Sequence, residues 1–138
     1  MNYEQAQWAM ENGQKVMVTT LERGCYVGYL EEVIPRRNRP WWGTVRITGV
    51  IEAQKTWRDS EPDRIGEAIE ASGRSVSPTD KEGGTLLEAL ESQLRTWDSI
   101  AQRNPTMLNR GVVESIKYKI EAEKGRRNDN KKQIKIAG

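Results

Sequence analysis

Alternation of apolar and polar residues in the first part of the chain predicts three consecutive β-strands. Within residues 14–21, which are rich in Val and Thr, Val16 and Val18 alternate with Lys15 and Met17, a pattern typical of a strand. Two longer stretches, 25–34 and 43–54, have the same character and predict the second and third strands. Gly28 and Gly49 interrupt these strands, and interior glycines are typical of the bulges at which small barrels bend.

Three other segments carry helix signals. Residues 2–12 place several apolar side chains at helical spacing and end at Asn12-Gly13, a suitable C-terminal stop. Pro62–Ala71 has a capping residue before it, Asp59, a proline in its first turn and two acids, Glu61 and Asp63, near its start, which favours a helix, although Gly66 weakens it. Residues 85–103 give the clearest signal, because Thr85 and Glu88 form a capping box before leucines spaced by three and four.

The C-terminal region returns to alternation. Apolar residues occupy every second position in 115–123 and again in 133–136, and turn-forming residues lie between them. The pattern predicts a terminal β-hairpin, with a helix over 112–124 as the alternative, since Glu, Lys and Ala also tolerate helices. Residues 72–84 are poor in apolar types and mark where any internal boundary falls.

Together these segments predict a single α+β domain over residues 1–138. We expect a small, bent antiparallel sheet or partial β-barrel of about five strands, with an N-terminal helix and two packed helices. Its parts are a helix and three-stranded meander in 1–58, a helical segment in 59–104 and the terminal β-hairpin in 111–138.

Composition narrows the classes of function. The 138 residues are 36% hydrophobic and 30% charged, with no apolar run that could span a membrane, and acidic residues occupy the N-terminus where a signal peptide is basic. We therefore expect a cytoplasmic protein. One cysteine and no histidine exclude an internal disulfide and a Cys/His zinc site, and they remove the usual nucleophile–base pairs. We expect neither catalysis nor a cofactor, and carboxylate-only magnesium or calcium sites stay open.

Charge is distributed unevenly along the chain. From Lys117 to its end the sequence contains eight Lys and Arg but three acidic residues. The part before Lys117 therefore has a small excess of negative charge, and the total is +2. A nearly neutral chain is a poor coat for long nucleic acid, whose non-specific binding grows with the number of neutralised phosphates. The nearly neutral total charge of this chain suits a compact anionic ligand better.

The loop between the second and third strands carries the main candidate site: Arg36, Arg37, Arg39, Trp41 and Trp42. Guanidinium groups grip phosphate or carboxylate through paired hydrogen bonds, and an indole gives a flat face for stacking. The alternative is that both tryptophans open a strand, one packing inward and one covering the barrel mouth, while the arginines are solvated.

Four further residues are candidates for additional contacts. Arg126 and Arg127 lie at the tip of the predicted terminal hairpin, where a soluble turn is the alternative. Asn109 and Arg110 lie in the connection before it and would complete a polar pocket.

A homo-oligomer is also expected. Leu86, Gln93 and Ile100 widen the apolar stripe of the predicted helix over 85–103, and the terminal hairpin would add edge strands to which a second copy could pair.

The first sixteen residues, from Met1 to Val16, resemble the short helix followed by Gly and a Lys-Val strand that begins many small phage-encoded proteins. Among these are anti-defence proteins that sequester a host's cyclic nucleotide signal. The resemblance implies a phage origin and a place in the host cytoplasm, and it transfers no binding residues.

The leading hypothesis is a non-catalytic protein that binds a phosphate-bearing ligand, either a nucleotide signal or an exposed nucleic-acid segment. The alternative is a protein-interaction or assembly component whose basic, Trp-bearing hairpin binds an acidic partner protein.

Overall fold

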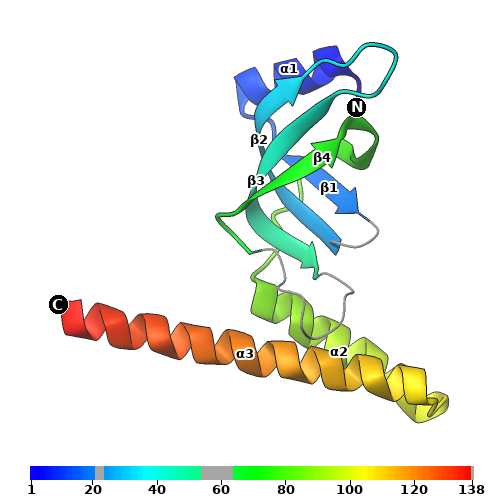
Figure 1. Ribbon diagram of the computed structural model, residues 1–138, viewed down its shortest axis with the longest axis vertical. Helices are drawn as coiled ribbons and strands as arrows, with labels where there is room; N and C mark the ends of the chain where they lie inside the picture. The colour runs from blue at the N-terminus through cyan, green and yellow to red at the C-terminus, as the bar shows by residue number, and fades with distance from the viewer. Residues whose placement is uncertain (21–23, 54–63, 138) are drawn as a thin grey trace. The chain divides into compact units, whose positions relative to one another are not determined.

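The computed structural model describes residues 1–20, 24–53 and 64–137, and for residues 127–137 it describes the backbone alone. The described residues divide into two compact units that meet in sequence between Leu86 and Leu87. This boundary lies just after the segment 72–84, where the sequence placed any internal division. The first unit contains the sheet, and the second contains a pair of long helices (Figure 1).

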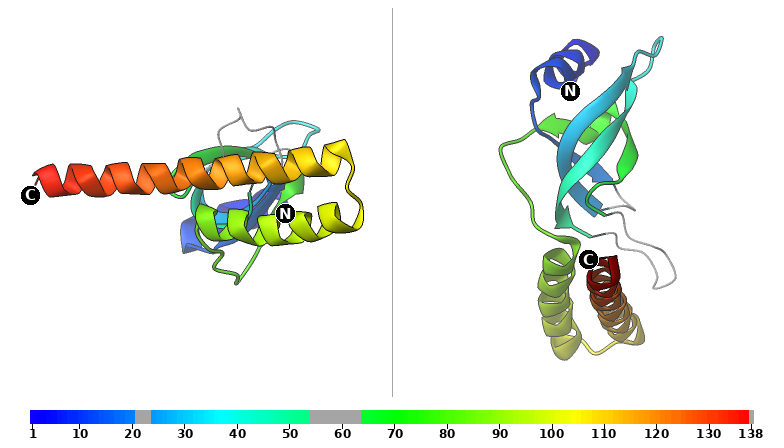
Figure 2. Two further views of the ribbon diagram at one scale, coloured as in Figure 1. Left: turned by 90° about the horizontal axis from the view of Figure 1, so that it is seen from below. Right: turned by 90° about the vertical axis from the view of Figure 1, so that its left-hand side faces the viewer.

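The first unit is built on a five-stranded antiparallel sheet with the strand order β4-β3-β2-β1-β5. In chain order its elements are α1 (Tyr3–Asn12), β1 (Val16–Thr20), β2 (Gly24–Ile34), β3 (Trp42–Glu52), β4 (Ala68–Ser72), the 3-10 turn η1 (Gly73–Ser75) and β5 (Val76–Pro78). The second unit contains α2 (Leu86–Arg103) and α3 (Met107–Ala137), which lie side by side (Figure 2). The predicted α+β class and the bent sheet of about five strands are confirmed.

Capping residues define both ends of helix α1. The Asn2 side chain accepts a hydrogen bond from the Gln5 backbone, and the Gln5 side chain accepts one from the Asn2 backbone, which together form a capping box. Gly13 ends the helix with a φ of 64°, a conformation that glycine adopts without strain. The predicted N-terminal helix is confirmed.

Strands β1, β2 and β3 form the centre of the sheet, as predicted. On β3, Val45 and Ile47 are buried, while Arg46 and Thr48, which alternate with them, are exposed. The register between β2 and β3 shifts at three places, one of them between Val27 and Gly28. The bulge expected near Gly28 is therefore present, and it helps the sheet to bend.

Gly28→Ala should destabilise the first unit by about 1–3 kcal/mol, as overpacking of a tight site does. A Cβ at this position would overlap the backbone carbonyl oxygen of Arg46, and main chain held in a sheet cannot move aside as a side-chain end can. Gly111→Ala, on α3 with no atom within 4 Å of the added Cβ, is the contrasting variant and should stabilise its helix by up to about 1 kcal/mol. Denaturant unfolding of both variants tests this, and a neutral Gly28→Ala would contradict it.

The predicted helix over Pro62–Ala71 is wrong for the described residues 64–71; residues 62 and 63 lie outside them. Gly66, with a φ of 94°, forms a turn, and its backbone N–H donates to the Ile47 carbonyl. The chain then runs as β4 against β3, with Ile69 and Ala71 buried and Glu70 exposed. Pairing satisfies the backbone groups along the outer side of β3, which outweighs a weak local helix signal.

The predicted terminal β-hairpin over 111–138 is also wrong, because α3 runs as a helix from Met107 to Ala137. Ile116 and Ile120, four residues apart, fit both a strand and a helix. Val113 is buried and Tyr118 is 56% exposed, and these two fit the helical period alone. The fourth and fifth strands are β4 and β5 instead, so the edge strands expected to pair with a second copy do not exist in this region.

Helix α2 confirms the prediction for 85–103. Leu86 and Leu90 are buried, and Ile100 near its end is 36% exposed. Within the described ranges, neither α2, α3 nor α1 is long and apolar enough to cross a membrane.

Candidate binding site

The turn between β2 and β3 presents the three predicted arginines to solvent. Arg36, Arg37 and Arg39 are all exposed, at the free end of the hairpin (Figure 1, cyan). Asn38 between them has a φ of 58°, a left-handed conformation that asparagine tolerates better than most residues. A reversal at Asn38 therefore keeps the three guanidinium groups on one short, protruding turn, which we call the arginine tip.

Trp41 does not belong to the exposed part of this turn, contrary to its assignment as a ligand-binding residue. Its side chain is 3% exposed, and its indole N–H donates to the Met1 carbonyl oxygen at 2.8 Å. Its own carbonyl accepts from the Gly73 backbone N–H at 2.8 Å, and Gly73 packs directly on the indole ring. Trp41 thus joins the N-terminus, the base of the hairpin and η1, and it offers no face to a ligand.

Trp42 is the more accessible of the two predicted tryptophans. It opens β3, is partly exposed, and lies under Arg36, whose guanidinium carbon is 5.5 Å from the ring centroid. This cation–π contact restricts the conformations of Arg36 before any ligand arrives. The arginine tip with Trp42 is the portion of the predicted site that the structure brings together.

The other predicted residues belong to the second unit. The Asn109 amide donates to the Asn104 carbonyl at 2.9 Å, and the Asn109 backbone N–H donates to the Thr106 hydroxyl, so Asn109 stabilises the start of α3. Arg110 and Arg126 are exposed along α3, and the Arg127 side chain lies outside the described residues. These residues do not share a compact unit with the arginine tip, and the hairpin tip that was expected to hold two of them is a helix.

The Glu31 carboxyl on β2 is poorly suited to act as a general acid. Glu31 accepts hydrogen bonds of 2.6 and 2.9 Å from Arg46, and these bonds lower the pKa of the Glu31 carboxyl. A carboxyl with a lowered pKa is ionised at neutral pH and is a poor proton donor. Among the described residues, no three Asp, Glu or Cys side chains are grouped so that they could hold a metal ion.

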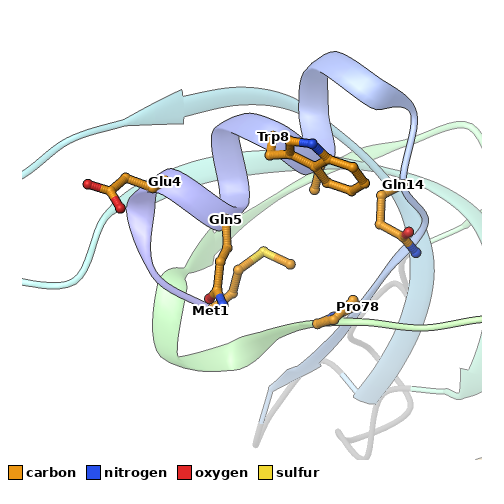
Figure 3. A pocket seen from close by; sticks show the side chains of 7 residues that line it. Met1, Glu4, Gln5, Trp8, Gln14 and Pro78 are labelled. Atoms are coloured by element: carbon orange, nitrogen blue, oxygen red, sulfur yellow. The ribbon is translucent and has the colours of Figure 1, made fainter.

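The sequence interpretation missed one surface, which lies on the first helix. Trp8 is 58% exposed and lies over a hollow between α1 and β5 (Figure 3). Glu4 and Glu11 lie four residues before and three residues after it, which places all three on one helix face. That spacing of acid, tryptophan and acid was the available signal.

Comparison with known proteins identifies the fold and no family. No family model matches the sequence, and no curated protein matches it. The fold is similar to the X-ray crystal structure of kinase-associated protein B from Bacillus cereus, with a TM-score of 0.61 and 16% sequence identity. The similarity covers 81% of this chain and 96% of that chain, and at this identity it concerns the fold alone.

Proposed function

We propose that this chain is a non-catalytic binding protein that recognises an acidic segment of a partner protein through the arginine tip and Trp42. The observation that carries the proposal is the group of three exposed arginines beside a tryptophan that one of them already covers.

The arrangement suits a protein surface better than a small enclosed ligand. Because Trp41 is buried, Trp42 is the one accessible indole at the tip, and a nucleotide base cannot be held there between two aromatic faces. Arginine and tryptophan are enriched in the residues that contribute most to protein interfaces, and a guanidinium pairs with a carboxylate through two parallel hydrogen bonds. Restriction of Arg36 by Trp42 reduces the entropy lost on binding.

The name of the similar Bacillus cereus protein associates that protein with a kinase. A protein-interaction role for this chain would belong to the same broad class, and the argument from the arginine tip does not depend on it.

A phosphate-bearing ligand is the second candidate. Three arginines within four positions of an exposed turn are also a phosphate-binding arrangement. A nucleotide signal sequestered in a phage-infected cell belongs to this candidate, as the resemblance of the first sixteen residues implies.

The two candidates are separated by one set of binding measurements on the full chain. A library of random displayed peptides is selected on the immobilised protein, and fluorescent single- and double-stranded oligonucleotides and a panel of mono-, di- and cyclic nucleotides are titrated in parallel. We expect enrichment of peptides rich in Asp and Glu. A triple variant, Arg36→Ala, Arg37→Ala, Arg39→Ala, should lose them.

Oligonucleotide or nucleotide binding that needs the same arginines, without acidic peptides, would support the second candidate instead. A nucleic-acid complex would weaken as a power of the salt concentration, in contrast to a nucleotide held in a small site. Absence of both kinds of ligand would overturn both candidates.

A further inference from the structure

Helix α1 exposes an aromatic side chain between two carboxylates. Trp8 is 58% exposed, and Glu4 and Glu11 are exposed on the same face, one turn to either side. No Lys or Arg occurs between Tyr3 and Asn12. A large exposed indole on a short helix is unfavourable in water, and this one is surrounded by negative charge alone along its helix.

A hollow of about 400 Å³ lies beside this face. Its lining residues are Met1, Glu4, Gln5, Trp8, Ala9, Gln14 and Pro78. Figure 3 shows the Trp8 ring over the hollow, with the Met1 side chain below it and Pro78 at its far wall. The lining is mostly apolar, and Glu4 carries its one charged side chain.

The floor of the hollow is held in place by the backbone of Met1. The Met1 amine donates to the carbonyl oxygens of Gly73 and Val76, each at 3.3 Å, and the Met1 carbonyl accepts from Trp41. Gln14 at the other end donates to the Thr79 carbonyl at 3.3 Å. These contacts tie the hollow to the core of the first unit, so that its shape exists before a ligand binds.

We propose that this face of α1 and its hollow form a second binding surface, which takes a basic segment of a partner protein. A Lys or Arg of that segment lies over the Trp8 ring and near Glu4 and Glu11, and a neighbouring aliphatic side chain enters the hollow. A cation is attracted to the face of an indole, and the two carboxylates add to this attraction.

The choice of a basic occupant follows from charge. An acidic segment of the kind proposed for the arginine tip would be repelled by Glu4 and Glu11, while a neutral apolar segment would leave both carboxylates unused. The two surfaces therefore select segments of opposite charge, and each can be tested without the other.

The peptide selection described above provides the test, with the full chain as the target. We expect a second class of enriched peptides, in which Lys or Arg is adjacent to Leu, Ile, Val or Met. Trp8→Ala should weaken these peptides at least about tenfold, as loss of a desolvated cation–π contact does. The double variant Glu4→Gln, Glu11→Gln should weaken them and reduce the salt dependence of their affinity.

The variant Arg36→Ala, Arg37→Ala is the matched control, and it should leave basic peptides bound while acidic peptides are lost. Failure of the arginine tip would thus remove the acidic class alone. The α1 proposal is overturned if no basic class is enriched, or if its affinity does not change with Trp8→Ala. It is also overturned if light scattering shows a Trp8-dependent dimer in the absence of peptide, because the occupant would then be a second copy.

Discussion

Trp41→Ala should lower the free energy of unfolding of the first unit by about 3–5 kcal/mol, the usual cost of truncating a buried aromatic side chain. The indole is buried and packs on Gly73, and its N–H is the donor to the Met1 carbonyl. Truncation opens a cavity and removes that donor together, so that both α1 and the base of the hairpin loosen. Denaturant unfolding followed by far-UV circular dichroism measures the change.

Trp42→Ala is the matched control for this prediction, because it removes the same side chain one position away. Trp42 is partly exposed and its ring lies under Arg36, so its loss should cost about 1 kcal/mol or less. Equal losses for the two variants would show that Trp41 does not hold the base of the hairpin. In binding the order should reverse, with Trp42→Ala weakening the acidic peptides while the fold persists.

Arg36→Ala, Arg37→Ala should weaken the selected acidic peptides by at least about a hundredfold. Each arginine contributes a charge-assisted contact worth roughly 1.5–3 kcal/mol, and two such losses exceed the 2.7 kcal/mol or so that a hundredfold change requires. Both side chains are exposed, so the free energy of unfolding should change by less than about 0.5 kcal/mol. Titration of a labelled peptide and denaturant unfolding give the two quantities.

A general effect of charge is controlled by Lys15→Ala, Lys81→Ala, which removes two positive charges of the first unit outside the hairpin and η1. This control should weaken the acidic peptides by a few-fold at most, through long-range attraction that salt screens. If it weakens them as much as the double variant at the tip, binding follows net charge and the arginine tip is not a site. An unchanged affinity in the tip variant would lead to the same conclusion.

Homo-oligomerisation stays a prediction. Residues 111–137 form a helix and supply no edge strands, so the predicted pairing of a terminal hairpin with a second copy no longer supports it. The remaining support is the apolar stripe of α2, in which Leu86 is buried and Ile100 is partly exposed.

Several elements were determined by signals within a few residues of one another. Gly13 ends α1, the alternation around Val16 and Val18 forms β1, and Thr85 with Glu88 marks the start of α2. These signals act through backbone conformation and local burial, which depend little on the rest of the chain. The exposed arginines of the tip could be predicted for the same reason, since a polar turn between two long strands has no core to enter.

The tertiary structure alone decided the remaining elements. Ile69 and Ala71 lie in a strand because their backbone pairs with the edge of β3. The local sequence around Pro62 contains no signal for this pairing. Ile116 and Ile120 are compatible with two periods, and burial of Val113 selected the helical one. Trp41, just before β3, and Trp42, the first residue of β3, carry the same side chain. The positions of Met1 and Gly73, distant in sequence, buried the first indole and left the second beside Arg36.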